Sequence, residues 1–233
     1  MGESYFAIIG DIVSSRREEK RDAVQKRLEE VLNRINEEFS DHIAANFLIT
    51  LGDEFQGLLY DAPGISPLRI ALTILDQMYP VRIRIAIGRG TMSTAINRMQ
   101  ALGADGEAFH RARSGIELIR ANERHADSSI LVCSCDEGCD RAVNTIIMLA
   151  FTIRRGWTSR QGEISRRYAE SQFSGERITQ SQLANEFGIS QSTFNISLTA
   201  SNAREYASGL LAAQAILSEG IPEKQSSDCS EKR

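Results

Sequence analysis

Two apolar runs that end at acidic residues stand out in the pattern of hydrophobic and polar positions along the chain. The first, residues 5–11, is apolar until Gly-Asp ends it at Asp11, which is typical of a strand buried on both faces. The second, residues 47–60, has two arms rich in Leu, Ile, Phe and Tyr around Asp53 and Glu54, and predicts a β-hairpin. Solvated turn residues would explain the hairpin acids alone, but a second acidic strand end favours a shared site.

The pattern continues to alternate between strand and helix up to about residue 139. Alternating apolar residues predict a half-buried strand over 81–87, and a short apolar run predicts another strand over 129–134. Helical spacing of apolar residues predicts amphipathic helices over 16–39, 67–79 and 107–122. The β-α-β-β-α-β order indicates an α+β, ferredoxin-like domain, in which helices cover one face of the sheet and leave the other available for a ligand or partner.

From about residue 140 the pattern is all-helical. An apolar linker helix comes first, a second helix is capped by Thr158, and an Ala- and Leu-rich helix covers 203–218. The polar C-terminal segment contains Pro222, and we expect it to be disordered. The chain therefore divides into a sheet domain, a helical domain and a tail, with the bounds 1–139, 140–218 and 219–233.

Within the helical part, residues 178–195 predict a helix-turn-helix. Thr179 and Ser190 are suitable N-caps, and Gly188 permits the left-handed conformation that ends the first helix. No Lys or Arg occurs from 178 to 203, so flanking arginines would have to neutralise the phosphates of duplex DNA. If the unit binds DNA, its second helix presents three polar side chains to base edges: Gln191, Ser192 and Asn195.

Composition and charge narrow the class of protein. The chain has 233 residues, of which 42% are hydrophobic and 25% charged, as in ordinary globular proteins. The net charge of -4 gives no global attraction to nucleic acid or to an anionic membrane. No run approaches the roughly 20 apolar residues of a membrane span, and no basic segment of the signal-peptide kind precedes the first strand. We therefore expect a cytoplasmic protein without a membrane partner.

The cysteine cluster raises the possibility of a zinc site. Cys133, Cys135 and Cys139 lie close together in the sequence, and His125 is near them. Their C-x-C-x₃-C spacing differs from the paired C-x₂₋₄-C of zinc knuckles, and Cys133 ends an apolar strand. We expect reduced thiols and no zinc.

The acidic strand ends predict a different metal. If the two strands are neighbours, Asp11 and Asp53 converge, and two like charges this close are costly unless a cation such as Mg²⁺ or Mn²⁺ lies between them. Glu54 would be a supporting ligand or base. The segment after Asp11 turns into a helix and directs backbone N–H groups to the same place, where they would bind nucleotide phosphates. The residues of this phosphate segment are Ile12, Val13, Ser14, Ser15 and Arg16.

These motifs resemble a family. Residues 10–15 look like the metal-binding first strand of class III nucleotidyl cyclases, and residues 51–55 are similar to their hairpin Gly-Asp and to the GGDEF signature of diguanylate cyclases. Residues 81–90 resemble the following strand and glycine pair, and residues 106–113 the next helix. The order is the same throughout. Over nearly its whole length the chain resembles the SatD family, bacterial proteins that couple such a domain to a helix-turn-helix.

The resemblance also defines where the chain departs from active cyclases. Ile49 occupies the position of the Lys or Glu that binds the purine, and Leu51 that of a glycine of diguanylate cyclases. His110 replaces a ribose-orienting Asn, and Arg113 falls one residue short of the transition-state Arg, although both can reach phosphates. We therefore predict that the protein binds a nucleoside triphosphate but is a poor cyclase.

Three functions remain open at this stage. The resemblance favours a cytoplasmic, bacterial-type regulator that binds a metal-nucleotide through a cyclase-like palm domain and signals through the helix-turn-helix, as a homodimer on DNA. An active nucleotidyl cyclase or nucleotidyltransferase is the first alternative. A ligand-free interaction scaffold is the second, although a scaffold does not need two acids at converging strand ends.

Overall fold

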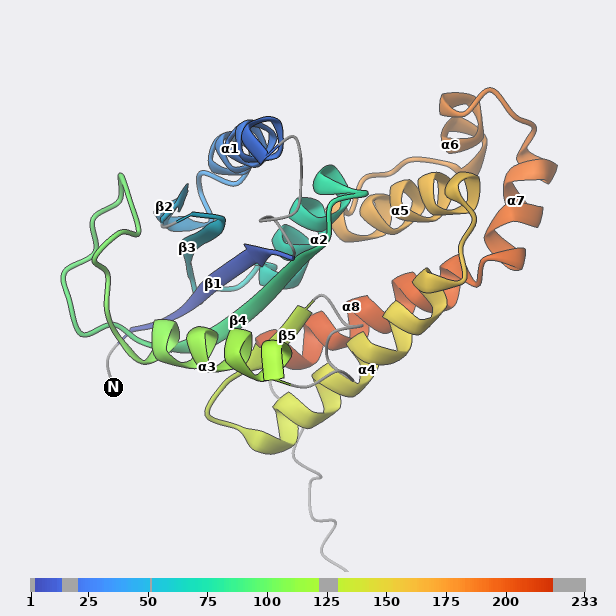
Figure 1. The fold of residues 1–233 in the computed structure, drawn as a ribbon. Coiled ribbons are helices and arrows are strands. Elements are labelled where there is room, and N and C mark those ends of the chain that lie inside the picture. Colours follow the sequence, from blue (N-terminus) through green and yellow to red (C-terminus); the bar gives the residue numbers. More distant parts are fainter. Residues whose placement is uncertain (1–2, 14–20, 51, 122–129, 220–233) are drawn as a thin grey trace, which may run out of the picture.

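The computed structural model describes residues 3–13, 21–50, 52–121 and 130–219. In these ranges the chain is a mixed α+β protein with five strands and eight helices (Figure 1). The strands are β1 (Ser4–Ile12), β2 (Ile43–Ile49), β3 (Glu54–Tyr60), β4 (Ile83–Thr91) and β5 (Ile130–Cys133). The helices are α1 (Arg21–Glu38), α2 (Pro67–Met78), α3 (Glu107–Ala121), α4 (Glu137–Arg155), α5 (Ser159–Ser174), α6 (Gln180–Glu186), α7 (Gln191–Ala200) and α8 (Ala203–Glu219).

The five strands form one mixed sheet in the order β2-β3-β1-β4-β5. The first four strands pair with antiparallel neighbours, whereas β5 runs parallel to β4. Strand β3 thus lies between β1 and β2, as in a split β-α-β unit. The predicted hairpin and its pairing with the first strand are confirmed, and Asp11 is the register partner of both Glu54 and Arg84.

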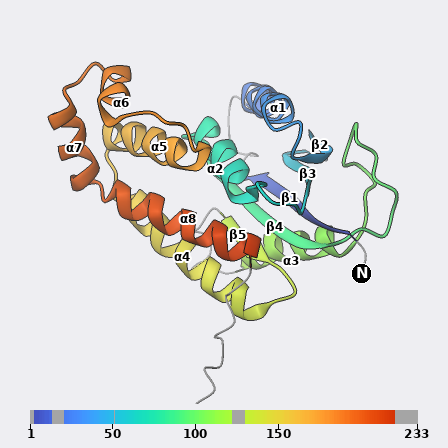
Figure 2. The same ribbon diagram turned by 180° about the vertical axis from the view of Figure 1, so that it is seen from behind.

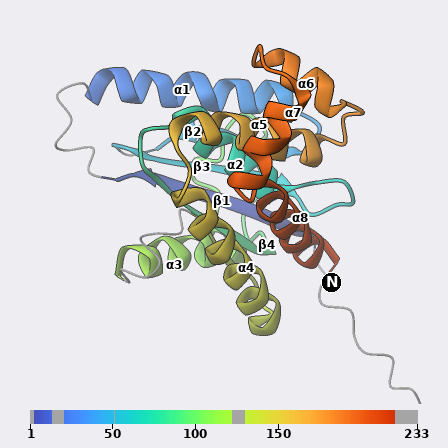
Figure 3. The ribbon, with the colours of Figure 1, turned by 90° about the vertical axis from the view of Figure 1, so that its right-hand side faces the viewer.

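Helices cover both faces of the sheet, as Figures 1 and 2 show. Helices α1 and α2 pack on one face, where Phe6 and Ile8 of β1 enter the main apolar core. Helix α3 and the residues 92–106 cover the opposite face, where Ala7 and Ile9 lie. Figure 3 shows α1 and α3 on opposite sides of the sheet. The prediction of an open second face was wrong, and the strand predicted as half-buried is instead a central strand enclosed on both sides.

Small residues allow α3 to lie close to β4. A Cβ atom at Gly88 would overlap the backbone of Ala108 and Ala112, and one at Gly115 would lie 2.8 Å from the Cβ of Ala86. Gly88 belongs to the strand and glycine pair that resemble the nucleotidyl cyclases. Because Gly88 has no side chain, the backbone of α3 can lie directly against β4.

Helices α4 and α8 pack against each other and add residues to the same apolar core as the sheet, α1 and α2. Helix α4 starts at Glu137 with Asp136 as N-cap, so the predicted domain boundary after residue 139 lies in its first turn. The division into domains stays a prediction. Helix α8 ends at Glu219, the first residue of the predicted tail, and residues 220–233 lie outside the described residues.

Helices α5, α6 and α7 surround a small core of their own, which includes Ile164, Leu183 and Phe194. The predicted helix pair over 178–195 is confirmed as α6 and α7, with Gly188 at φ +64° in the turn. The three predicted N-caps are also confirmed, since their side chains accept hydrogen bonds from the first turns of their helices: Thr158, Thr179 and Ser190.

Asparagine side chains cap both edges of the sheet. Asn36 of α1 accepts a hydrogen bond from the Phe47 N–H at 2.8 Å and donates one to the Phe47 carbonyl at 2.9 Å, on edge strand β2. Asn144 of α4 makes the same pair with Val132 on edge strand β5, at 2.8 and 2.7 Å. Each amide occupies backbone groups through which a further strand would pair.

None of the helices within the described ranges is both long enough and apolar enough to cross a membrane.

Candidate functional site

Asp11 lies at the end of β1 and is 7% exposed. Its side chain points to the α3 face, since the next residue, Ile12, packs in the core on the other face. Arg84 of the neighbouring strand β4 binds the carboxylate through two nitrogens of its guanidinium. Nε donates to Oδ1 at 2.8 Å, and Nη2 donates to Oδ2 at 3.1 Å. This two-bond geometry fixes the orientation of the carboxylate.

Two arginines of α3 complete the site. Arg120 donates to Asp11 Oδ2 from Nη2 at 2.6 Å and from Nε at 3.0 Å, and its Nη2 also lies 3.8 Å from Glu54 Oε2. Arg113 donates from Nη1 to Glu54 Oε1 at 3.2 Å. Residues seven apart return to the same side of a helix, so α3 presents both arginines to the sheet. We call the five residues the Asp11 cluster: Asp11, Glu54, Arg84, Arg113 and Arg120.

The tip of the hairpin lies beside the end of β1. The Ile12 N–H donates to the backbone carbonyl of Asp53 at 3.3 Å, and the Val13 N–H donates to the carbonyl of Arg82 at 2.8 Å. The predicted convergence of the strand end and the hairpin is therefore present in the backbone.

As it stands, the Asp11 cluster does not fit a divalent cation. Among the residues that the structure describes, no three His, Cys, Asp or Glu side chains are placed to hold a metal ion. Both oxygens of Asp11 accept hydrogen bonds from guanidinium groups, so arginine charge occupies the position expected for the metal. Binding of Mg²⁺ or Mn²⁺ by Asp11 and Asp53 stays a prediction.

The sequence matches a protein-family model over most of its length. The SatD family model matches residues 5–217. The chain belongs to the SatD family. A search of curated proteins found no relative that matches this SatD chain.

The other residues predicted to contact the nucleotide do not all reach the cluster of this SatD protein. Ile12 ends β1 and Val13 follows it, whereas Ser14, Ser15 and Arg16 lie outside the described residues. His110 is exposed, 2.8 Å from Asp105, and lies about 15 Å along the α3 axis from Arg120 at 1.5 Å per residue. Arg113 does reach the cluster, where it pairs with Glu54 at 3.2 Å while its side chain stays exposed.

The polar residues predicted to face DNA lie on α7. Gln191 accepts a hydrogen bond from Ser181 of α6 at 2.8 Å, and Asn195 accepts one from Arg204 of α8 at 2.8 Å. Ser192 is exposed. Two of the three side chains therefore also tie α7 to its neighbours, and Arg204 brings a positive charge next to Asn195.

Sequence reasoning missed Arg84 and Arg120. Arg84 lies on the polar face of the predicted strand 81–87, and an arginine opposite an aspartate on adjacent central strands is a signal for a buried ion pair. Arg120 lies seven residues after Arg113, and that spacing was a signal for one shared helix side. Neither signal was decisive before the strand order was known.

Proposed function

We propose that this SatD-family protein is a regulator that binds a nucleotide at the Asp11 cluster and signals through α5, α6 and α7 to DNA. In this proposal the sheet with α1, α2 and α3 corresponds to a ferredoxin-like, cyclase-like palm, and α6 and α7 to a helix-turn-helix. The alternatives are an active nucleotidyl cyclase or nucleotidyltransferase and a ligand-free interaction scaffold.

The observation that carries the proposal is the buried Asp11 carboxylate, which two arginines bind. Removing two charged groups from water costs about as much as their attraction returns, so apolar packing would stabilise this position equally well. An aspartate held by two arginines next to a strand end and a helix-preceding segment is better explained by ligand binding. Guanidinium groups that now bind carboxylates have the fork geometry to bind phosphate oxygens.

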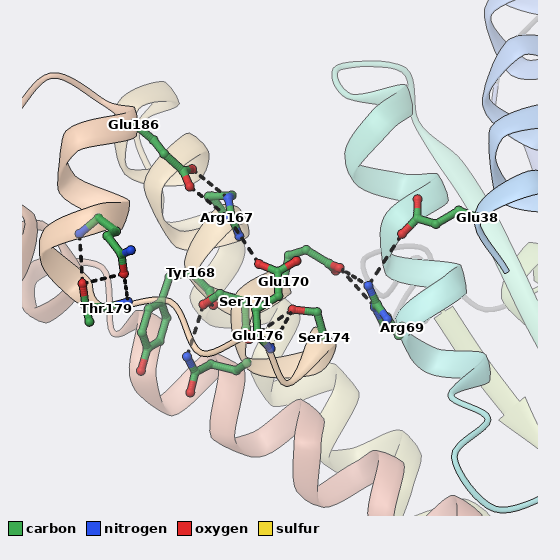
Figure 4. A network of polar contacts seen from close by, with 12 residues as sticks. Glu38, Arg69, Arg167, Tyr168, Glu170, Ser171, Ser174, Glu176, Thr179 and Glu186 are labelled. Carbon is green, nitrogen blue, oxygen red and sulfur yellow. Dashed lines mark hydrogen bonds and ion pairs between the residues drawn. The ribbon is translucent and has the colours of Figure 1, made fainter.

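Ion pairs between the sheet helices and the helical part supply a route for the signal. Arg69 of α2 donates to Glu170 of α5 at 2.7 and 3.0 Å and lies 3.6 Å from Glu38 of α1 (Figure 4). On the same helix α5, Arg167 pairs with Glu186 of α6 at 2.8 Å. The Asp11 cluster lies on the other face of the sheet from α1 and α2, so a ligand there would act on α5 and α6 by moving the strands on which α1 and α2 pack.

A thermal-shift panel tests nucleotide binding. Each of ATP, GTP, CTP and UTP is added with Mg²⁺, with Mn²⁺ or with EDTA, and ligand at 100 times its Kd stabilises by about 2.7 kcal/mol. We expect a shift with at least one nucleotide, lost in Asp11→Asn and Arg120→Gln. The EDTA arm decides whether the nucleotide needs a metal.

Asp61→Asn is the matched control, because Asp61 is also held by an arginine, Arg89, at 2.7 and 3.1 Å but lies at the opposite end of β3 from Glu54. It should keep the shift. A parent protein that responds to no nucleotide would contradict the proposal and favour the scaffold alternative.

Turnover distinguishes regulator from enzyme. Ile49, His110 and Arg113 depart from the active cyclases, and loss of a transition-state stabiliser commonly costs on the order of 10² to 10³ in rate. Mass spectrometry after incubation with each nucleotide and Mn²⁺ should detect no cyclic product. A cyclic product formed at several turnovers per second, and lost in Asp11→Ala, would establish the enzyme instead.

DNA binding is tested by fluorescence anisotropy with duplex DNA at increasing salt, together with sedimentation to measure the expected homodimer. Affinity should be weak and fall as salt rises, because phosphate contacts release counterions. Ser192→Asp should weaken binding, since it adds a negative charge to the exposed side of α7. A flat salt response would assign α5, α6 and α7 to protein contacts.

A further inference from the structure

Arginine occupies the Asp11 carboxylate almost completely. Among the residues that the structure describes, this carboxylate accepts four hydrogen bonds, and each comes from a guanidinium group. Arg84 donates two of them, at 2.8 and 3.1 Å, and Arg120 donates the other two to Oδ2, at 2.6 and 3.0 Å. An ionised carboxylate offers about four lone-pair sites, and a ligand of a divalent cation needs one of them for the metal. The two arginines therefore use the acceptor capacity that a cation would require.

One nitrogen of Arg120 lies between the acids of two neighbouring strands. Its Nη2 is 2.6 Å from Asp11 Oδ2 on β1 and 3.8 Å from Glu54 Oε2 on β3. Asp11 and Glu54 are register partners in the sheet. The positive charge of Arg120 thus stands where a cation shared by both carboxylates would stand.

The charges of the Asp11 cluster leave no deficit for a metal ion to fill. The cluster holds three guanidinium groups and two carboxylates, and the acid of the hairpin tip, Asp53, would only make the numbers equal. A divalent cation placed among them would be repelled by every guanidinium. The sequence predicted a cation because two acids end neighbouring strands, and the arginines remove that reason.

Arg120 is the partner of Asp11 that faces solvent. Its side chain is 45% exposed, compared with 22% for Arg84 and 9% for Asp11. It also belongs to the last turn of α3, where the negative end of the helix dipole favours a positive charge. Arg120 therefore covers the carboxylate on the side from which an ion in solution would approach.

We propose that the guanidinium of Arg120 takes the place of a divalent cation at Asp11, so that the Asp11 cluster excludes Mg²⁺ and Mn²⁺ and binds its ligand without metal. Asp11 is then a positioning residue that orients Arg84 and Arg120, and it is not a metal ligand. Metal-free binding of the ligand rests on the proposed function. Exclusion of the metal depends on the cluster alone.

Electron paramagnetic resonance of Mn²⁺ tests the exclusion directly, because the signal of the free ion is lost when the ion binds. The parent protein should bind no Mn²⁺ in a way that depends on Asp11. Arg120→Ala should bind Mn²⁺ at least roughly tenfold more tightly than the parent, because two carboxylates lose the cation that they share. Asp11→Asn added to Arg120→Ala should abolish this gain, which locates the new site at the cluster.

Two further variants separate the charge of Arg120 from the loss of any helix arginine. Arg111→Ala is the matched control, since Arg111 also belongs to α3 and pairs with an acid, Glu107, at 3.1 Å. It lies nine residues before Arg120, about 13 Å along the helix axis, and its loss should leave Mn²⁺ binding within about twofold of the parent. Arg120→Lys keeps the positive charge and should still exclude Mn²⁺. Circular dichroism verifies that every variant is folded.

The ligand supplies the second readout. For each nucleotide that stabilises the parent, the thermal shift in EDTA should be at least as large as the shift in Mg²⁺, because metal competes with the arginines for phosphate oxygens. Three results would overturn the proposal: an Asp11-dependent Mn²⁺ site in the parent, no gain of Mn²⁺ binding in Arg120→Ala, or a nucleotide shift that requires Mg²⁺. If no nucleotide shifts the parent, the proposed function fails, and the Mn²⁺ comparison still decides the exclusion.

Discussion

At the scale of single residues, Cys133 and Cys135 are expected to differ in reactivity. Burial and, as a smaller cause, the nearby Asp140 carboxylate raise the pKa of the Cys133 thiol to about 11, whereas Cys135 is exposed. The thiolate is the reactive form. At pH 8, iodoacetamide should therefore modify Cys135 much faster than Cys133, as measured by mass spectrometry of peptides. Equal rates for the two would contradict the buried position of Cys133 at the end of β5.

Gly88 should be among the least replaceable residues of the sheet. A Cβ atom there overlaps α3 backbone that cannot move without leaving the sheet, so Gly88→Ala should lower the free energy of unfolding by at least about 2 kcal/mol. Gly209 of α8 is the control, because its added Cβ would meet only Ile146 at 3.5 Å. Gly209→Ala should be neutral or stabilise by up to about 1 kcal/mol in urea unfolding, since alanine favours helix.

The candidate site was predictable from sequence only in part, and the reason is the range of the contacts. Asp11 and the hairpin acids ended apolar runs, so local pattern located them. Arg84 and Arg120 act through strand order and helix packing, which no local pattern contains. The sequence therefore predicted that Asp11 lies next to a positive charge, which was expected to be a metal ion. In the structure the positive charges next to Asp11 are those of Arg84 and Arg120.

At the scale of elements, prediction succeeded where local chemistry determines the structure. Thr158, Thr179 and Ser190 cap helices because their hydroxyl groups satisfy backbone N–H groups of the following turn. It failed for the open face of the sheet, since covering that face depends on α3 folding back onto β1 and β4. The small residues that permit this contact, such as Gly88 and Ala112, follow the strand and helix periods, but neither period tells which helix packs on which face.

The N-cap residue of α6, Thr179, should contribute to the stability of the protein although its side chain is exposed. This helix has seven residues, and short helices depend on their ends. Thr179 accepts from the Gln182 N–H at 3.2 Å, and Gln182 accepts from the Thr179 N–H at 2.8 Å. Thr179→Ala should cost about 1 kcal/mol in chemical unfolding. Thr179→Ser keeps the hydroxyl and should cost less, and equal losses for both variants would exclude capping as the cause.

At the scale of the whole molecule, the helical part is not attached by a linker alone. Helices α4 and α8 share the main apolar core with the sheet, and Arg154 of α4 joins Asp76 of α2 at 2.6 Å and the Tyr206 hydroxyl of α8 at 3.2 Å. Such contacts couple the stability of the two parts.

We therefore predict one unfolding transition for the whole chain. Trp157 fluorescence reports the junction between α4 and α5 and far-UV circular dichroism reports all helices, and their thermal curves should coincide. Arg154→Met leaves the Asp76 carboxylate without its closest guanidinium, so it should lower the free energy of unfolding by about 1 to 3 kcal/mol. Both thermal curves should shift to lower temperature together. Two separated transitions would instead establish independent folding of the helical part.

The asparagine amides at Phe47 and Val132 have a consequence for how copies of this protein can associate. With those backbone groups occupied, two copies cannot join there by extending one sheet across an interface. A homodimer would have to form through side chains on helices or loops, and single surface substitutions change such contacts readily. Association could then be gained or lost during evolution while the sheet that carries Asp11 remained unchanged.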